Sequence, residues 1–496
     1  MKQQPHADPK SARAAWLDEW QLPLLWAAGL ALAILLVVNK VNATPKYALV
    51  FNEMLVHLLH GRFDLDPSTI GSEAYVYKGR TYAYFGVFCA LLRLPLLLTG
   101  QIGADITKLS MIFAAALSLG ARLAAVRLAM SRAPGLSREL SWIILGAVAF
   151  GGESLQYLRP SLFQEVCSWG AALSSVFVLL AVRRILSPGP EAWRLYAGMA
   201  LAAGLALLCR VSFGLGLYAA VGLMLVIEVW RGRARLPGLR ALAPAVLVLA
   251  LFAGLAGAVN KARWDDPLAF VPVRYQTLMG QADPDRAVRL ARYGAVNPVR
   301  APFALQYYFA PLWAVRDGTG QLFFQQAQLD LFDSVELPPS SFLLSDPLLC
   351  VLAALGLGAL ARRRPQLEEA ALARGALLGL AIPGAVMLCA ISLTFRYRMD
   401  FYPGLDFAAC IGLAAMGREP KPITARPWLY MAVGGAVVSL ISLTLYSYAP
   451  FGPAVDLDMR NGWITPMVET AQGRDPFIGH LMRDGRRLNI PAADPH

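Results

Sequence analysis

The sequence predicts an all-α membrane protein that crosses the bilayer about eleven times. Three observations predict this class: 57% of the 496 residues are hydrophobic, only 16% are charged, and the mean hydropathy is +0.49. In a soluble globular protein about a quarter of the residues are charged. The chain is therefore expected to bury its apolar surface in lipid.

Eleven apolar stretches account for the predicted crossings. A helix needs about 20 mostly apolar residues to cross about 30 Å of hydrocarbon. Such stretches fall near residues 22–40, 106–130, 140–157, 163–184, 194–210, 212–230, 239–259, 346–361, 373–394, 402–416 and 427–447. Together they predict one transmembrane domain over residues 22–447.

The basic residues predict which helix ends face the cytoplasm, because Lys and Arg concentrate in short cytoplasmic loops. Five connections between predicted spans carry such residues: Arg132 with Arg138, Arg183 and Arg184 with Arg194, Arg231 to Arg240, Arg362 to Arg364 with Arg374, and Arg418 to Arg426. If all five are cytoplasmic, residues 1–21 are a cytoplasmic tail. The C-terminal tail, residues 448–496, then lies outside.

A twelfth apolar stretch, residues 84–100, is predicted not to cross. Arg93 and Pro95 lie in its middle, where an arginine costs several kcal/mol and a proline removes a backbone donor. Counting it as a crossing would also move the five basic connections outside. We therefore predict an interfacial or re-entrant helix within a first outer loop, residues 41–105.

The composition also limits the classes of molecule that the protein is expected to bind. The net charge of +12 comes from basic residues spread over short inner loops, without the aromatic-interleaved basic stripe that tracks a phosphate backbone, so nucleic acid is not an expected partner. The six cysteines have no metal-ligand spacing and suggest no disulfide framework. The polar N-terminal segment lacks the short apolar core of a cleaved signal, so the first span is expected to be retained.

Three long polar segments are predicted on the outer side: residues 41–105, 260–345 and 448–496. Loops of this length in a compact protein usually carry function or are disordered. The middle segment is expected to cap a site together with the tail, either selecting an acceptor or acting as a lid without selectivity. Its aromatic and basic residues include Arg274, Tyr275, Tyr307 and Tyr308.

The first outer loop carries acidic, histidine and basic residues. Apolar residues recur at helical spacing over residues 49–59, and Gly61 is the expected stop. The polar face of this surface helix and the residues after it supply Asn52, Glu53, His57, His60, Asp64, Asp66, Glu73, Lys78, Arg80, Tyr82 and Tyr84. Together they could bind a phosphate head group and activate a hydroxyl. Taken singly, such carboxylates are more often solvated or capping groups, and Asp64 and Asp66 beside Pro67 fit a turn.

A short turn further along carries Glu153 and Glu165, one on each side of it and at or just inside the predicted membrane boundary, with Arg159 between them. An ionisable residue at membrane depth is a functional candidate. A structural ion pair between a glutamate and Arg159 explains the same residues equally well.

Three arginines depart from the inner location of the other basic residues. Arg396 and Arg398 follow a predicted span on the outer side, and Arg210 lies at the outer end of another span. The first two either pair with Asp400 and Asp406 or hold an anionic ligand such as a lipid phosphate.

The whole pattern resembles the GT-C superfamily of integral membrane glycosyltransferases. The resemblance rests on one span, a long outer loop with surface helices and a Pro-containing segment that does not cross, many further spans, and an outer C-terminal part. Closer similarity is to bacterial family 39-like transferases related to the lipid A aminoarabinose transferases and protein O-mannosyltransferases. The stretches that carry it are LVHLLHGRFDLD, GRTYAYFG, LRPSLFQEVCSWG, LALLCRVSFG, VNKARWDDPLAF, LPPSSFLLSDP and FRYRMDFYP.

The resemblance implies a reaction and a place. A sugar on a polyprenyl-phosphate donor would pass, with inversion, to an envelope lipid, glycan or protein acceptor at the periplasmic face of a bacterial inner membrane. A first-loop carboxylate would act as base or help to bind a divalent metal ion such as Mg²⁺ or Mn²⁺, and basic residues would hold the phosphate. These roles fall to Glu53, Glu165 and Asp64 as catalytic residues, and to Lys78, Arg80, Tyr82, Arg159, Arg210, Arg396 and Arg398 as binding residues.

One departure from the family leaves two other functions open. The family's acid normally follows the first span directly, and NKVNATPKY at that place contains no Asp or Glu. The chain could therefore be a non-catalytic relative that binds lipid-linked glycan or scaffolds envelope assembly. A lipid or glycan transporter would instead show broken helices, internal repeats and charges at mid-membrane, and no repeat is evident in the sequence.

Overall fold

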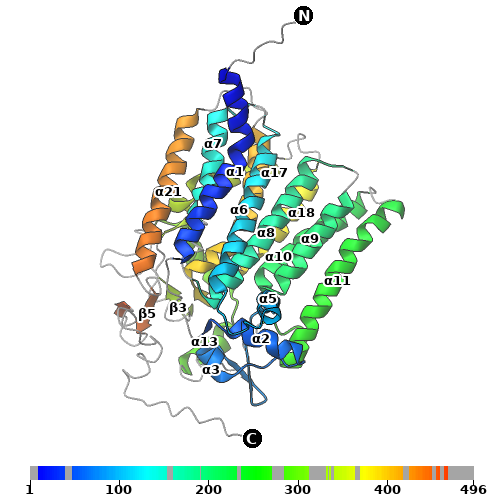
Figure 1. Cartoon of the computed structure of the whole chain (residues 1–496), viewed down its shortest axis with the longest axis vertical. Helices are drawn as coiled ribbons and strands as arrows, with labels where there is room; N and C mark the ends of the chain where they lie inside the picture. The colour runs from blue at the N-terminus through cyan, green and yellow to red at the C-terminus, as the bar shows by residue number, and fades with distance from the viewer. Residues whose placement is uncertain are drawn as a thin grey trace, which may run out of the picture.

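The structure is a computed structural model of the chain, and its helices form an elongated bundle with small loop elements at one end (Figure 1). It describes residues 9–38, 47–133, 135–152, 160–189, 192–231, 236–270, 284–311, 331–332, 334–336, 340–362, 369–416, 424–448, 454–458 and 463–466. Glu153, Arg159, Arg274 and Tyr275 lie outside these ranges.

Long helices occupy all the predicted spans. They are α1 (Pro9–Val38), α6 (Thr107–Met130), α7 (Arg138–Phe150), α8 (Leu162–Leu186), α9 (Ala192–Leu207), α10 (Val211–Trp230), α11 (Leu236–Trp264), α17 (Pro347–Ala361), α18 (Ala370–Leu380) with α19 (Ile382–Leu388), α20 (Tyr402–Met416) and α21 (Ala425–Tyr448). Within the described ranges, six segments are long and apolar enough to cross a membrane: Trp20–Val38, Thr107–Met130, Leu162–Leu186, Val211–Trp230, Leu242–Trp264 and Ala370–Leu388. The predicted all-α polytopic membrane class is confirmed.

The helices approach closely where glycines face a neighbouring backbone. A Cβ atom added at Gly356 of α17 would clash with the carbonyl of Ala408 in α20, and one added at Gly379 of α18 would clash with the backbone of Ala220 in α10. Small residues permit such contacts between membrane helices, for which lipid supplies no hydrophobic driving force. The sequence of the spans therefore fixes which helices pair.

The short elements gather at the end of the bundle where α1 and α21 finish, which we call the loop end (Figure 1). The first loop contributes α2 (Val50–Leu59), α3 (Pro67–Ile70), η2 (Gly71–Glu73), β1 (Tyr75–Tyr77), β2 (Arg80–Tyr82), α4 (Phe88–Leu91) and α5 (Leu94–Leu98). Later segments contribute α13 (Pro284–Tyr293), η4 (Pro298–Arg300), α14 (Ala301–Phe309), β3 (Ser334–Glu336), α16 (Phe342–Ser345), β4 (Ser392–Leu393), η6 (Phe395–Asp400), β5 (Ala454–Asp458) and β6 (Trp463–Pro466).

The predicted surface helix and the predicted non-crossing segment are both present. Helix α2 ends at Leu59, and Gly61 has a φ of 70° just beyond it. Asn52 departs from the expected polar face, because its side chain is buried and its amide donates to the carbonyls of Ile102 and Ala104 at 2.6 and 2.9 Å. Residues 84–100 form α4 and α5, of four and five residues. At 1.5 Å per residue neither helix can cross.

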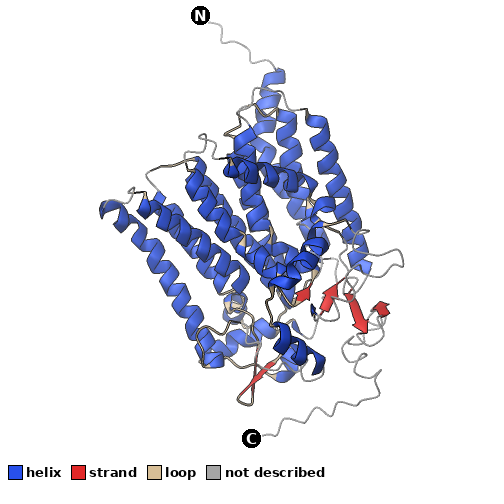
Figure 2. Ribbon diagram, turned by 180° about the vertical axis from the view of Figure 1, so that it is seen from behind, coloured by secondary structure: helices blue, strands red, loops and turns tan. Residues whose placement is uncertain are grey.

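Two small sheets were not expected from the sequence, and Figure 2 shows their strands confined to the loop end. Strands β1 and β2 form an antiparallel hairpin in which Tyr75 faces Tyr82. Lys78 and Gly79 connect them with φ angles of 50° and 73°, the pair of positive values that a tight hairpin turn requires. The second sheet has the order β4-β3-β5-β6. Strands this short leave too little alternation for a sequence pattern to indicate them.

Candidate functional site

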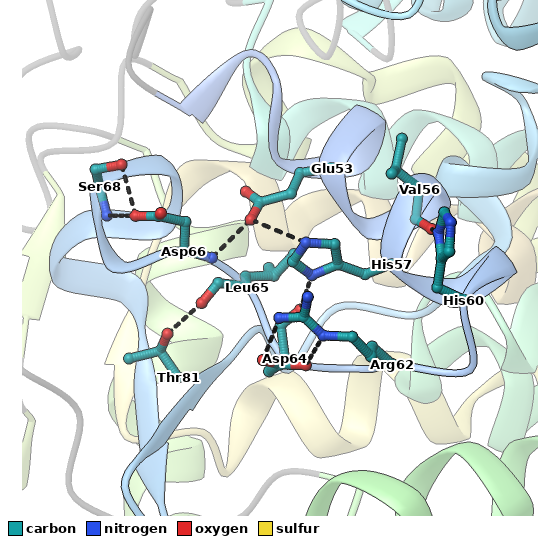
Figure 3. Close-up of polar contacts among 10 residues, drawn as sticks. All are labelled: Glu53, Val56, His57, His60, Arg62, Asp64, Leu65, Asp66, Ser68 and Thr81. Carbon is teal, nitrogen blue, oxygen red and sulfur yellow. Dashed lines mark hydrogen bonds and ion pairs between the residues drawn. The ribbon is translucent and has the colours of Figure 1, made fainter. Parts of the chain in front are cut away.

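Helix α2 and the turn after it bring together a first-loop cluster of Glu53, His57, Arg62, Asp64 and Asp66 (Figure 3). Glu53 Oε1 accepts a hydrogen bond from the Asp66 backbone amide at 2.7 Å and lies 3.7 Å from His57 Nε2. His57 Nδ1 is 2.6 Å from the Asp64 carbonyl oxygen. A carbonyl can only accept, so Nδ1 carries the hydrogen and Nε2 is the nitrogen that faces Glu53.

The two aspartates of this cluster are each held in place by a donor. Arg62 donates to both oxygens of Asp64, at 3.2 and 2.8 Å, and this hydrogen bond lowers the pKa of Asp64. Asp66 caps α3 by accepting from the backbone amide and hydroxyl of Ser68 at 2.7 and 2.6 Å, and these bonds lower its pKa. The turn interpretation of Asp66 therefore agrees with the structure. Glu53 differs, because its buried Oε2 has no hydrogen-bond partner among the described residues.

The hairpin β1–β2 connects the first loop to the end of α11. Lys78 Nζ lies 2.5 Å from Asp265 Oδ2, and the Tyr77 hydroxyl donates to the same oxygen at 2.8 Å. These two donors, Lys78 first, lower the pKa of Asp265. The Tyr82 ring packs 5.2 Å from that of Trp264. The predicted binding residues of the hairpin thus face an acid and an indole ring at the end of a membrane helix.

Arg80 joins the hairpin to the first-loop cluster. It precedes Thr81, whose carbonyl accepts from the amide of Leu65, the neighbour of Asp64, at 2.8 Å, and its charge contributes to lowering the pKa of Asp64 after the larger effect of Arg62. Glu53, Asp64, Arg80 and Tyr82 consequently belong to one region of the loop end.

Glu165 occupies a different environment. In the first turn of α8 its two oxygens accept from Nη1 and Nη2 of Arg93, the second bond being 2.8 Å long. Both side chains are wholly buried. Arg93 comes from the junction of α4 and α5, whereas the sequence had offered Arg159 as the partner. Glu165 can accept a proton only if this ion pair opens.

The predicted outer arginines also have specific partners. Arg210 Nη2 lies 2.7 Å from Asp400 Oδ2, and Arg398 Nη2 lies 2.8 Å from Asp346 Oδ2. Asp406 pairs with Arg122 at 2.9 Å. Of the two alternatives for Arg396 and Arg398, pairing with Asp400 and Asp406 is therefore not what the structure shows, because Arg210 and Arg122, far away in the sequence, occupy these carboxylates.

Arg396 lies where η6 meets the first loop. Its guanidinium group stacks on the rings of Phe163 and Tyr397, at 4.9 and 5.4 Å from their centres. Burial raises the pKa of Tyr84, Glu73 raises it further, and Arg396 opposes the shift. Both charged groups therefore act on the Tyr84 hydroxyl. The sequence placed Glu73 and Tyr84 among the polar residues of the first loop, and only the fold brings them to Arg396.

The residues of the first-loop cluster do not fit a divalent metal ion. Mg²⁺ and Mn²⁺ prefer several carboxylate or carbonyl oxygens around one point. In the part of the chain that the structure describes, no group of three or more His, Cys, Asp or Glu side chains could hold an ion. Arg62 occupies both oxygens of Asp64, and Ser68 occupies one oxygen of Asp66. We therefore derive no step through a metal.

Comparison with known proteins gives a likeness of fold. No known family matches the sequence, and no curated protein matches it. The oligosaccharyltransferase AglB of Archaeoglobus fulgidus, solved with an inhibitory peptide and a dolichol-phosphate, is 15% identical, with a TM-score of 0.45 over 88% of this chain and 56% of that chain. The apo form of the enzyme is 14% identical, with a TM-score of 0.46 over 89% and 57%.

A third structure of the same enzyme, a complex with Zn and sulfate, is 15% identical, with a TM-score of 0.44 over 88% of this chain and 53% of that chain. The chain thus spans little more than half the length of these structures.

Proposed function

We propose that this protein is a GT-C-type membrane glycosyltransferase that moves a sugar from a polyprenyl-phosphate donor to a hydroxyl or amine of a lipid, glycan or protein acceptor. The observation that supports it most is made at the loop end, where buried Glu53 Oε2 has no hydrogen-bond partner among the described residues and the Arg396 guanidinium group stacks on Phe163 at 4.9 Å. Carboxylates that can activate a nucleophile and a cation that can hold a phosphate are thereby combined at one end of the bundle.

Glu53 is the proposed base. Its Oε1 is fixed by the Asp66 amide, which leaves Oε2 to take the proton of the acceptor. The acceptor atom forms a bond to the anomeric carbon while the bond from that carbon to the phosphate oxygen breaks, and the phosphate leaves with the electron pair. A single displacement of this kind inverts the anomeric centre. Asp64, next to Arg80, would orient the sugar or the acceptor.

The basic residues divide into two groups in this proposal. Arg396 would stabilise the charge that develops on the leaving phosphate, and Lys78, Arg80 and Tyr82 would orient head groups. Arg210 and Arg398, already engaged by Asp400 and Asp346, would act mainly by holding η6 in place. Arg159 stays a predicted binding residue.

Glu165 would contribute to the reaction indirectly, by positioning the first loop. Through Arg93 it would fix α4 and α5 against α8, and so hold the first loop over the bundle. Its predicted direct catalytic part would require the ion pair to open during the reaction.

We further propose that the loop end faces the periplasm of a bacterial inner membrane. Helix α1 begins at the opposite end and α21 finishes at the loop end (Figure 1). The connections that carry the basic clusters join helices away from the loop end, as cytoplasmic loops would. The N-terminus would then be cytoplasmic and the C-terminus periplasmic.

The test compares envelope glycans and lipids by mass spectrometry in a strain that lacks the protein and in restored strains. Wild type and the control Glu139→Gln, an exposed glutamate at the start of α7, should restore a missing sugar. Glu53→Gln should not, although its protein is present in the membrane at the wild-type level. Unchanged glycans in the deletion strain, or full restoration by Glu53→Gln, would contradict catalysis.

A non-catalytic function is the second candidate. It is favoured by the engagement of both Glu165 oxygens and by the lack of an acid directly after the first span. A protein of this kind would bind lipid-linked glycan through the same arginines without turnover. Binding of a polyprenyl-phosphate sugar by the purified protein, together with unchanged envelope glycans in the deletion strain, is the result it predicts.

A further inference from the structure

A groove opens between α9, α10 and α11. Its volume is about 530 Å³, and its walls include Leu215 and Tyr218 of α10 and Gly254 and Gly257 of α11. Almost all of the lining is apolar. Helix α11 stands at the edge of the bundle in both views (Figures 1 and 2), and its outer side chains are exposed, Leu251 by 58%. The groove therefore lies in a surface that faces lipid.

The groove extends over about half of the membrane thickness. Tyr218 lines the groove, and its hydroxyl donates to the Leu249 carbonyl at 2.9 Å and so connects α10 to α11. Lys261 stands at the limit near the loop end. On α11 the lining runs from Ala253 to Lys261, which is a rise of about 12 Å at 1.5 Å per residue, and half of the hydrocarbon core is about 15 Å. The groove thus matches one lipid leaflet.

Small residues of α11 keep the groove open. A Cβ atom at Gly254 would meet no atom within 4 Å, and one at Gly257 would meet only Pro267, at 3.5 Å. On another side of α11, Phe252 packs so closely on Gly204 of α9 that a side chain there would clash with it. The helix is therefore held against α9 while its glycine face leaves a slot beside α10.

Lys261 places a positive charge at the mouth of the slot. Its side chain is exposed, and its charge contributes to lowering the pKa of Asp265, after the larger effects of Lys78 and Tyr77. Asp265, the nearby acid, is engaged by Lys78 and Tyr77. A lysine at the membrane surface attracts anionic lipid head groups.

We propose that this groove binds one acyl chain of an anionic phospholipid, with the phosphate of its head group at Lys261. The groove has a volume of about 530 Å³ and an almost wholly apolar lining. A site of this length and lining suits a single acyl chain. A polyprenyl carrier chain is several times longer and would not be contained. This inference does not depend on the proposed activity.

The test uses the full-length protein in nanodiscs with phosphatidylglycerol or phosphatidylcholine that carries a photoactivatable group in the acyl chain. Labelled peptides are then identified by mass spectrometry. Phosphatidylglycerol should label the α11 segment around Gly254 in the wild type. Gly254→Leu fills the slot and should remove this labelling, whereas Gly358→Leu, at an equally open glycine of α17, should leave it unchanged. Thermal unfolding of both variants verifies that they are folded.

The head group is tested separately. Lys261→Gln should lower phosphatidylglycerol labelling about fivefold, the effect of one basic residue near the surface, and leave phosphatidylcholine labelling unchanged. Lys108→Gln, at the same end of α6, is the control. Equal labelling by the two lipids in the wild type, unchanged labelling of Gly254→Leu, or displacement of phosphatidylglycerol by an equal amount of polyprenyl phosphate would each overturn the proposal.

Discussion

Arg93 and Glu165 form a two-bonded ion pair that is wholly closed to solvent and connects the non-crossing α4–α5 segment to the start of α8. Arg93 Nη1 also donates to the Cys89 carbonyl at 3.1 Å, and its guanidinium group lies 5.2 Å from the centre of the Phe51 ring. Removing two charges from water is costly unless both are paired and hydrogen-bonded. The pair therefore determines where the first loop attaches to the bundle.

We expect Arg93→Gln and Glu165→Gln each to lower the free energy of unfolding by about 3 to 5 kcal/mol, because each leaves one buried charge without its partner. The double variant Arg93→Met with Glu165→Leu should recover most of this loss, since two apolar side chains need no partner. Denaturant unfolding of the purified protein in detergent measures all three. Single variants as stable as the wild type would show that the pair is open in the membrane protein.

The same residues show what the sequence could and could not predict. Arg93 correctly indicated that residues 84–100 do not cross, because the cost of a central arginine depends on local sequence alone. Its partner could not be found this way, since Glu165 is 72 positions further on and only the packing of α4 beside α8 brings the two together. The spans were predictable for the same local reason, whereas strands of two to five residues were not.

Residues of the candidate site were also predictable only where they lie close together in the sequence. The first-loop cluster was visible in the sequence because Glu53, His57, Asp64 and Asp66 lie within 14 consecutive positions. The arginines of η6 were also visible, but their partners were not. Asp346, which pairs with Arg398, precedes it by 52 positions, and Asp400 pairs with Arg210 across 190. Ion pairs between distant helices depend on how the bundle packs, and no short-range pattern in the sequence predicts them.

Protonation of Asp64 should weaken the turn after α2. Arg62 holds the pKa of Asp64 below its usual value in the folded protein. A carboxyl group with a depressed folded pKa stabilises the fold above its unfolded pKa, and this stabilisation is lost as the pH falls through the folded pKa. We therefore expect the stability difference between wild type and Asp64→Asn to be constant above about pH 5 and to shrink below about pH 4, the ordinary range of Asp titration. Thermal unfolding of both proteins across this range measures it, and a difference that grows on acidification would contradict the assignment.

Arg396 and Arg398, two positions apart, should respond differently to the same substitution. Arg396→Gln should lower the rate of sugar transfer by about 10²- to 10³-fold, as loss of one group that stabilises transition-state charge does, and should cost less stability than Arg398→Gln. Arg398→Gln should instead lower the free energy of unfolding by about 3 to 5 kcal/mol, because it takes the guanidinium partner from buried Asp346. A transfer assay with a polyprenyl-phosphate sugar and an unfolding series on the same preparations separate the two effects. If both variants lose the same free energy of unfolding, Arg396 stabilises the fold and not the leaving phosphate.

Asp346, which pairs with Arg398, leaves room at position 152 only for glycine. The Gly152 backbone amide donates to Asp346 Oδ1 at 2.8 Å, and a Cβ atom at this position would overlap the other carboxylate oxygen. Gly152→Ala must therefore displace Asp346 from Arg398 or move the end of α7. Overpacking of this kind costs about 1 to 3 kcal/mol.

Gly146 of α7 provides the matched control, because a Cβ atom there meets nothing within 4 Å. In a helix interior alanine is favoured over glycine by about 0.5 to 1 kcal/mol, so Gly146→Ala should leave the melting temperature unchanged or raise it, while Gly152→Ala lowers it. If the melting temperature of Gly152→Ala equals or exceeds that of the wild type, Asp346 must be free to move away. The buried contact between Asp346 and Arg398 would then not be what holds η6 in place.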